Sequence, residues 1–208
     1  MEQRLLGITA MPIDEREKVH TISKSDKRNV LASLSLAFVA DPGVRWFFPS
    51  PPSYQEYFPK FVLAYGGKSF EHGTAHSIGN WAGAALWVPP EVQPDDDAID
   101  EVFMDAMPDA KLATMVEFEQ RLERYYPEEP FWELAVLGVE PTQQGKGYGT
   151  RLMEAVLTEC DRTGSPAFLI SSNVRNLSFY LRHGFEILDT IQLGSMPPFF
   201  PMRRDPQA

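Results

Sequence analysis

Residues 131–150 read FWELAVLGVEPTQQGKGYGT and join an apolar run to a glycine-rich stretch. Phe131 to Val139 is apolar at all but one position, which predicts a buried central strand. Tyr148 to Arg162 carries apolar residues at helical spacing, and Gly164 is placed to end that helix. The stretch therefore predicts a strand, a glycine-rich turn and a helix that buries Leu152, Met153, Val156, Leu157 and Cys160.

A glycine-rich turn between a strand and a helix has a physical use in binding anions. It exposes several backbone N–H groups at a helix N-terminus, where the helix dipole also favours negative charge. Gln144 to Thr150 supplies three glycines for such a turn. Glycine lets the backbone approach a phosphate without a Cβ in the way.

Three phosphate-binding patterns compete for this turn, and one fits. A Walker loop requires Ser or Thr after Gly-Lys, but Gly147 follows Lys146. A dinucleotide fingerprint requires a third glycine where Thr150 stands. The pattern that fits is Q/R-x-x-G-x-G, formed by Gln144, Gly147 and Gly149. A glycine-rich turn that binds nothing is the alternative.

This pattern resembles the pyrophosphate-binding motif of the GNAT acetyltransferases, in which backbone amides hold coenzyme A without a metal. The resemblance extends to Val139-Glu140-Pro141 before the loop and to Asn173, Tyr180 and Gly184-Phe185 after it. It covers residues 131–193. It implies acetyl-CoA as co-substrate, no metal, and a small-molecule amine as acceptor.

The resemblance also implies the fold class. This is an α/β (α+β) GNAT fold, a mixed, mostly antiparallel twisted sheet flanked by helices, with an acidic helical segment before the central strand. We expect one domain over residues 1–208, with its cofactor-binding core at 131–193. Periodicity and turn residues predict further elements: a helix capped by Ser25 or Asp26 and ended by 41–43, a helix over 54–65, hairpin strands over 74–78 and 82–88, a strand over 167–171, a short helix over 173–183, and strands over 185–193 and 199–203.

Further segments are similar to the puromycin N-acetyltransferase branch of that family. They are residues 38–42, 84–91, 129–132, 166–169 and 175–180, so the likeness runs loosely over most of the chain. Enzymes of this branch act on many small amines. The resemblance implies a cofactor site made of Leu137, Gly138, Val139, Gln144, Gly145, Lys146, Gly147, Tyr148, Gly149, Thr150, Asn173 and Asn176.

Glu133 is the one charged residue in the predicted central strand, eleven residues before Gln144. An alkylamine with a pKa of about 10.4 is protonated at pH 7 and must lose a proton before it attacks a thioester. A carboxylate can accept that proton, and the offset resembles the catalytic glutamate of histone-type GNAT enzymes. A buried structural acid is the alternative.

Tyr180 holds the motif position from which a phenol can protonate the leaving thiolate. An ordinary core tyrosine is the alternative, and Asn173 can either contact the pantetheine arm or cap its helix. A backbone N–H near Leu137 to Val139 would stabilise the developing oxyanion. The resemblance places the earlier aromatic segments opposite the thioester, which makes Phe38, Trp46 and Trp87 candidate acceptor contacts.

The net charge of −10 is concentrated between Glu91 and Glu129, where thirteen acids face three bases. Either this segment is a solvated helical surface, or it forms a rim that attracts cationic substrates. No basic stripe is present, which argues against nucleic-acid binding. The Met-rich, Pro-rich tail 196–202 could cover the acceptor pocket or extend the edge strand.

Other features set the broad class. No apolar run approaches the length of a membrane span, and the charged N-terminus does not resemble a secretory signal, so we expect a cytoplasmic monomer or homodimer. The single cysteine, Cys160, excludes an intramolecular disulfide and sits at core spacing. His72 and His76 have metal-like spacing but lack the intervening Glu of a zinc-protease helix, so no metal is expected.

Three functions follow. The first is acetyl transfer from acetyl-CoA to a primary amine of a small molecule by direct attack. The second is N-acetylation of proteins or peptides, and the third is a catalytically silent sensor of acyl-CoA.

Overall fold

The computed structural model describes residues 18–207, so the charged N-terminal stretch discussed above lies outside the described residues. The core is a seven-stranded sheet in the order β1-β2-β3-β4-β5-β7-β6. All neighbouring strands are antiparallel except β4 and β5, which are parallel. The predicted mixed, mostly antiparallel sheet is confirmed. The strands are β1 Val19–Thr21, β2 Ala75–Ile78, β3 Gly83–Val88, β4 Trp132–Val139, β5 Ala167–Ser171, β6 Glu186–Ile187 and β7 Phe200–Arg204.

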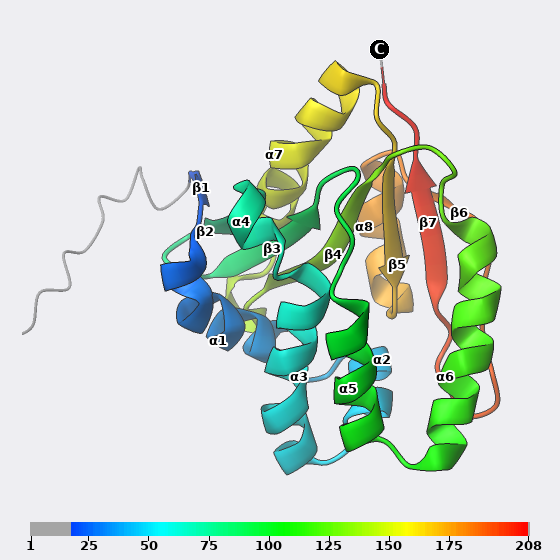
Figure 1. Cartoon of the computed structure of the whole chain (residues 1–208). Coiled ribbons are helices and arrows are strands. Elements are labelled where there is room, and N and C mark those ends of the chain that lie inside the picture. Colours follow the sequence, from blue (N-terminus) through cyan, green and yellow to red (C-terminus); the bar gives the residue numbers. More distant parts are fainter. Residues whose placement is uncertain (1–17, 208) are drawn as a thin grey trace, which may run out of the picture.

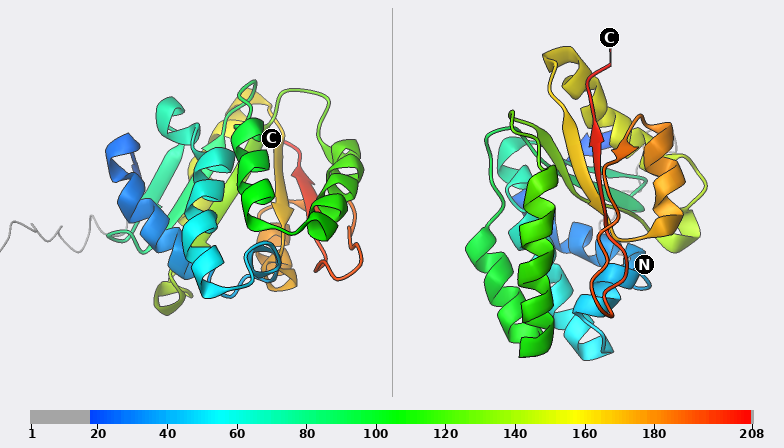
Figure 2. Two further views of the ribbon diagram at one scale, coloured as in Figure 1. Left: turned by 60° about the horizontal axis from the view of Figure 1, so that its bottom comes forward. Right: turned by 90° about the vertical axis from the view of Figure 1, so that its right-hand side faces the viewer.

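Helices cover both faces of this sheet (Figures 1 and 2). One face carries α1 Lys27–Ala37, α3 Pro51–Gly66, α5 Asp96–Ala106 and α6 Asp109–Leu122; the other carries α7 Tyr148–Thr163 and α8 Leu177–Arg182. The shorter helices are α2 Pro42–Phe47 and α4 Ser69–His72, with 3₁₀ turns η2 Lys24–Asp26, η3 Glu123–Tyr125, η4 Pro141–Gln143 and η5 Val174–Asn176. Because both faces are covered, the central strands are apolar nearly throughout.

Helix α7 follows the glycine-rich turn as predicted. Its five expected core residues are all buried against the sheet. Its last turn ends at Gly164, whose φ of +69° is a left-handed conformation that glycine adopts without strain. The segment therefore packs as a standard amphipathic helix whose N-terminus points back to the end of β4.

Several sequence predictions were wrong in detail. Of the two predicted caps, Asp26 stands at the N-cap position of α1 but forms no side-chain cap hydrogen bond, and Ser25 lies inside the turn η2, which Ser23 caps. Asp41 does not merely end α1, because its carboxylate accepts the Val44 N–H and starts helix α2.

The predicted strand over 199–203 is β7, shifted by one residue, whereas the predicted strand over 185–193 is mostly absent. Only residues 186–187 pair as a strand, and the chain from 188 to 199 keeps a single bridge between Ile191 and Phe199. Strand β7 lies between β5 and β6, so the tail is an interior strand rather than an edge. Among residues 18–207, no helix combines the length and apolarity that a membrane span requires.

Candidate active site

Strands β4 and β5 are paired at one end only, and this opens a gap in the middle of the sheet. Their register includes Trp132 with Ala167 and Glu133 with Phe168, and then stops. Beyond that point β4 runs on to Val139 while β5 turns away (Figure 1). The backbone groups of residues 134–139 that face β5 therefore have no strand beside them, which leaves polar groups available to a ligand.

A β-bulge in β4 sets which side chains face this gap. Trp87 of β3 pairs with Leu134 and Leu86 pairs with Val136, so Ala135 has no partner. The extra residue breaks the two-residue alternation of side chains. As a result Glu133, Ala135 and Val136 all line one cavity on the α3 side of the sheet.

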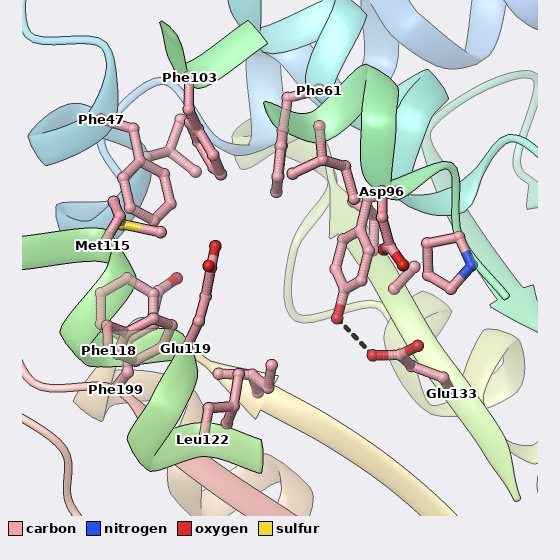
Figure 3. Close-up of a pocket in the computed structure, with 18 of the residues that line it drawn as sticks. Phe47, Phe61, Asp96, Phe103, Met115, Phe118, Glu119, Leu122, Glu133 and Phe199 are labelled. Atoms are coloured by element: carbon pink, nitrogen blue, oxygen red, sulfur yellow. Dashed lines mark hydrogen bonds between the residues drawn. The ribbon is translucent and has the colours of Figure 1, made fainter. Parts of the chain in front are cut away.

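That cavity has a volume of about 540 Å³ and is walled mainly by aromatic side chains (Figure 3). It lies between β4, β5 and the helices α3, α5 and α6, and reaches Ile170 and Ser172 across the gap. Its size is typical of small-molecule sites. The phenylalanines of its wall are Phe38, Phe47, Phe58, Phe61, Phe103, Phe118, Phe131 and Phe199.

Glu133 lies at the inner end of this cavity and is only 5% exposed. Its carboxylate accepts a hydrogen bond from the hydroxyl of Tyr65 at 2.7 Å (Figure 3). Burial raises the pKa of Glu133 to about 7; the Tyr65 hydrogen bond lowers this pKa and the Asp96 carboxylate raises it. A carboxylate with this pKa changes protonation state near neutral pH, as a general base must.

Three further acids lie at the cavity wall on the helical side: Asp96, Asp100 and Glu119. Within residues 18–207 none of them forms an ion pair. Desolvation, followed by repulsion from Asp100 and Asp96, raises the pKa of Glu119. These three members of the acidic segment therefore lie at the rim of the cavity, where the rim alternative from the sequence placed them.

Glu133 also borders a second, smaller cavity of about 260 Å³. The wall of this cavity includes the exposed residues Glu91, Glu128 and Glu129. The buried carboxylate thus has an aromatic environment on one side and a polar path toward the surface on the other.

The glycine-rich turn lies at the other end of the gap and presents unused donors. None of the backbone N–H groups of residues 145–150 has an acceptor within the described part of the chain. Gly145 and Gly147 have φ of +79° and +78°, and a Cβ built on either would meet no atom within 4 Å. The side chain of Gln144 holds the turn, since it donates to the Val139 carbonyl at 3.1 Å. The loop is an open nest of N–H groups at the start of a 16-residue helix, which suits a phosphate.

Tyr180 lies on the opposite face of the sheet from the aromatic cavity, in the core beneath α7. It is 8% exposed, and its hydroxyl forms no hydrogen bond within residues 18–207. Desolvation first, and then the Asp41 carboxylate, raise its pKa above the ordinary value. Asp41 accepts a 2.7 Å hydrogen bond from Ser172, a cavity residue that directly follows β5. Tyr180 is thus within electrostatic range of Asp41, which contacts the residue that follows β5.

Of the three aromatic residues predicted to contact the acceptor, one lines the cavity. Phe38 lines the cavity, whereas Trp87 is fully buried in the core on the α7 side and does not reach it. Trp46 also lies outside the cavity wall, where its carbonyl accepts from Lys111 and its ring stacks under that ammonium. The side chain of Asn173 caps η5 by accepting the Arg175 N–H, as the capping alternative proposed. Asn176 precedes α8 without a side-chain cap.

Tyr65 is a cavity residue that the sequence did not indicate, and the rim acids were indicated only as members of a larger charge cluster. Tyr65 is separated from Glu133 by 68 positions, and its helix shows only ordinary apolar periodicity. The acids were visible as a charge cluster, but the helical fold alone selects the three that face the cavity. No signal in the sequence distinguishes them from the others.

Comparison with known proteins assigns the class to which this fold and site belong. The sequence model of the Acetyltransferase (GNAT) family matches residues 54–185, and the chain belongs to this family. A relative in Schizosaccharomyces pombe, named an uncharacterized N-acetyltransferase, is 25% identical over 89% of this chain and 82% of its own length. The protein is thus an acyltransferase.

Solved structures show the same fold. The histone acetyltransferase HPA2 and related acetyltransferase from Corynebacterium glutamicum superposes with a TM-score of 0.66 at 20% identity, covering 92% of this chain and 97% of that one. The polyamine N-acetyltransferase of Drosophila melanogaster gives 0.63 at 17%, covering 89% and 96%. Arylalkylamine N-acetyltransferase 2 from Aedes aegypti gives 0.58 at 15%, covering 91% and 99%.

Enzymes of this family use acetyl-CoA, and the residues of the open gap fit that molecule. The N–H nest offers donors to a diphosphate, and the glycines leave room for it. Lys146 is exposed beside the nest and can add a positive charge. Among the described residues no group of three or more His, Cys, Asp and Glu is arranged to hold a metal ion.

Proposed function

We propose that this protein transfers an acetyl group from acetyl-CoA to a primary amine of a small molecule by direct attack. One observation carries the proposal: a buried carboxylate with a pKa near 7 lies in a small-molecule cavity whose floor is the open gap between β4 and β5. The same gap leads to the N–H nest at α7. Acceptor and donor sites thus meet at one break in the sheet.

In this proposal Glu133 is the general base. It accepts a proton from the incoming ammonium group and leaves the amine lone pair free for attack. The aromatic wall helps, since burial lowers the pKa of an amine toward that of the carboxylate. The second cavity gives Glu133 a polar path along which that proton can return to solvent.

Bound acetyl-CoA would supply the activated acyl group. Backbone groups of β4 alternate between β3 and the gap, so the N–H of Leu137 or Val139 would stabilise negative charge on the carbonyl oxygen. Tyr180 would donate its proton to the departing thiolate, and the second proton that the amine loses as the amide forms would restore the phenol. The unpartnered hydroxyl supports this role, because a core tyrosine normally pairs its hydroxyl with a protein acceptor.

We further propose the puromycin N-acetyltransferase-like branch as the nearest group, supported by the five similar segments. The names of the neighbours support a small acceptor in general terms, since the Drosophila and Aedes proteins are named for polyamine and arylalkylamine acetylation. Another neighbour, Naa20 from Chaetomium thermophilum, was solved with a bisubstrate analogue, so peptide acceptors belong in the test.

The test is release of free thiol from acetyl-CoA in the presence of a panel of acceptors that includes puromycin, simple amines and peptides. We expect rapid thiol release with small amines and a product that has gained one acetyl group. Peptides as the preferred acceptors would contradict the proposal. Tight coenzyme A binding with no thiol release for any acceptor would contradict it as well.

The loop is tested with two glycines in the same backbone conformation. Gly147→Ala and Gly164→Ala both place a Cβ at a left-handed φ with open space around it, so both should lose about 1–2 kcal/mol of stability. Because only Gly147 lies at the nest, only Gly147→Ala should weaken coenzyme A binding. Isothermal titration in EDTA measures this affinity, and chelation should not change it.

Two outcomes would contradict the loop assignment. One is an equal effect of the two alanines on affinity, and the other is a large loss of wild-type affinity when the chelator is added.

Tyr65 is tested as a positioning residue for Glu133. Tyr65→Phe removes a hydrogen bond that stabilises the carboxylate and therefore raises the Glu133 pKa above about 7. The acidic limb of the kcat/KM profile should move to higher pH by roughly one unit. A pH–rate profile of the variant checks this, and an unmoved limb would show that Tyr65 only packs.

A further inference from the structure

We infer that the acceptor is a primary amine on an apolar, aromatic body that carries no carboxylate or phosphate. This inference rests on the proposed function, because it takes the cavity of Glu133 as the acceptor site. It adds what kind of amine fits there. The argument comes from the composition of the wall, from the position of its charges, and from the depth of the apolar end.

The cavity wall is mainly aromatic, and its polar members are Gln93, Ser172, the hydroxyls of Tyr65 and Tyr126, and four carboxylates. Phe61 shows how the aromatic part is packed. Its ring centroid lies 5.5 Å from that of Phe103 and 5.6 Å from that of Tyr65. Tilted contacts of this kind leave ring faces and edges for another ring to pack against. Against these rings, hydroxyl-rich or amide-rich acceptors would lose hydrogen bonds to water that aromatic side chains cannot replace.

The apolar part of the cavity lies away from the reactive end. Phe47, Met115 and Phe118 are on the side of the cavity remote from Glu133 (Figure 3). An acceptor whose amine reaches Glu133 thus places the rest of its body against these side chains. The body that packs on these side chains is apolar and the amine is at its end, while Glu119 also borders this side of the cavity (Figure 3).

The charges of the site exclude anionic acceptors. None of the described lining residues is Lys, Arg or His, while four carboxylates face the space, those of Glu133 and the three rim acids. A carboxylate or phosphate on the acceptor would be desolvated among like charges with no partner. Free amino acids and phosphorylated amines are therefore poor acceptors.

The rim acids attract one cation rather than hold a second one. Asp96, Asp100 and Glu119 are all exposed to solvent, unlike the buried Glu133. Exposed ion pairs contribute little binding free energy, but a cluster of one sign raises the local concentration of cations and speeds their entry. The site thus favours a monoamine with an apolar body over a diamine of the same length.

Four amines of matched chemistry test this inference with the intact protein and acetyl-CoA. They are 2-phenylethylamine, phenylalanine, n-propylamine and 1,4-diaminobutane, with thiol release as the readout. We expect kcat/KM for 2-phenylethylamine to exceed that for n-propylamine by about 10²-fold, the effect of burying one ring. Phenylalanine, which adds only a carboxylate, should be at least roughly 10²-fold poorer than 2-phenylethylamine.

Two variants test whether this cavity causes the preference. Met115→Trp fills the apolar end and should lower the ratio of kcat/KM for 2-phenylethylamine over n-propylamine by about tenfold or more. Phe70→Leu is the control, because Phe70 is 6% exposed on the same face of the sheet but does not line the cavity. It should lower the melting temperature and leave the ratio unchanged. If Met115→Trp does not fold, Phe61→Ser replaces it, with the same expected fall in the ratio.

The outcomes separate the two proposals. Preference for 1,4-diaminobutane or for phenylalanine, with rapid thiol release, would overturn the acceptor class and leave the acetyltransferase proposal standing. An unchanged ratio in the cavity variant would also overturn the class. No thiol release with any amine, despite coenzyme A binding, would overturn the proposed function itself.

Discussion

Replacement of Glu133 by Gln is expected to lower kcat/KM by about 10² to 10⁴-fold, the usual effect of removing a general base. The amide keeps the shape of the side chain and can still accept the hydrogen bond from Tyr65, so the cavity should persist. The wild-type kcat/KM should rise with pH through a pKa of about 7, as Glu133 loses its proton. In the Glu133→Gln variant this limb should be absent.

The same substitution should increase stability at high pH, because Glu133 then carries a buried charge that Gln lacks. The Glu133 pKa is about 7 in the folded protein against an ordinary value of 4.5, so the folded state holds the proton more tightly. Tighter binding of this proton stabilises the folded state relative to high pH. This stabilisation is fully present below pH 4.5 and is lost as the pH rises through 7. Above pH 7 the buried charge costs up to about 3 kcal/mol, and Gln removes that cost.

Unfolding of wild type and Glu133→Gln at pH 4 and pH 8 tests this sign. We expect similar stability at pH 4 and a more stable variant at pH 8. The groups that face Glu133 are Tyr65 of α3, Asp96 of α5 and Tyr126 after α6; the Asp96→Asn variant identifies any contribution of that carboxylate. A variant that is destabilised at both pH values and retains turnover would make Glu133 a structural acid.

Tyr180→Phe should lower kcat by about 10² to 10⁴-fold with little change in stability or coenzyme A affinity. The ring stays in place, and the lost hydroxyl has no partner within the described residues, so no protein group is left unsatisfied. Melting temperature, affinity and turnover are measured on one preparation. Turnover near that of the wild type would remove Tyr180 from the mechanism.

Tyr54→Phe is the matched control for this experiment. Tyr54 is equally buried, but its hydroxyl donates to the Ser35 carbonyl at 2.6 Å, outside the cavity. Loss of that hydrogen bond should cost about 1 kcal/mol of stability and leave turnover unchanged. The two variants therefore separate a hydroxyl that stabilises the fold from one that takes part in chemistry.

The loop, the helix after it and the central strand could be predicted from the sequence because their signals are local. Strand β4 was predicted within one residue, β5 at its bounds, and the burial of five residues in α7 from helical spacing alone. The lone charge at Glu133 was visible as an exception in an apolar run. The predictions were weaker for residues 185–193, where only Glu186–Ile187 pair, and they pair with β7.

The proposed acceptor site depends on tertiary structure. Three features of this site involve residues far apart in the chain: the break in the β4–β5 pairing, the bulge at Ala135, and the contact between Tyr65 and Glu133. Hydrophobic periodicity reports only on neighbours along the chain and cannot predict such contacts. Trp87 illustrates the limit: an aromatic residue in a strand can face either side, and only packing against α7 decided its face. By itself the sequence determined the family motif and its carboxylate, since both depend on neighbours along the chain. The folded sheet decided the rest, because the cavity exists only where helices from distant segments pack over the gap.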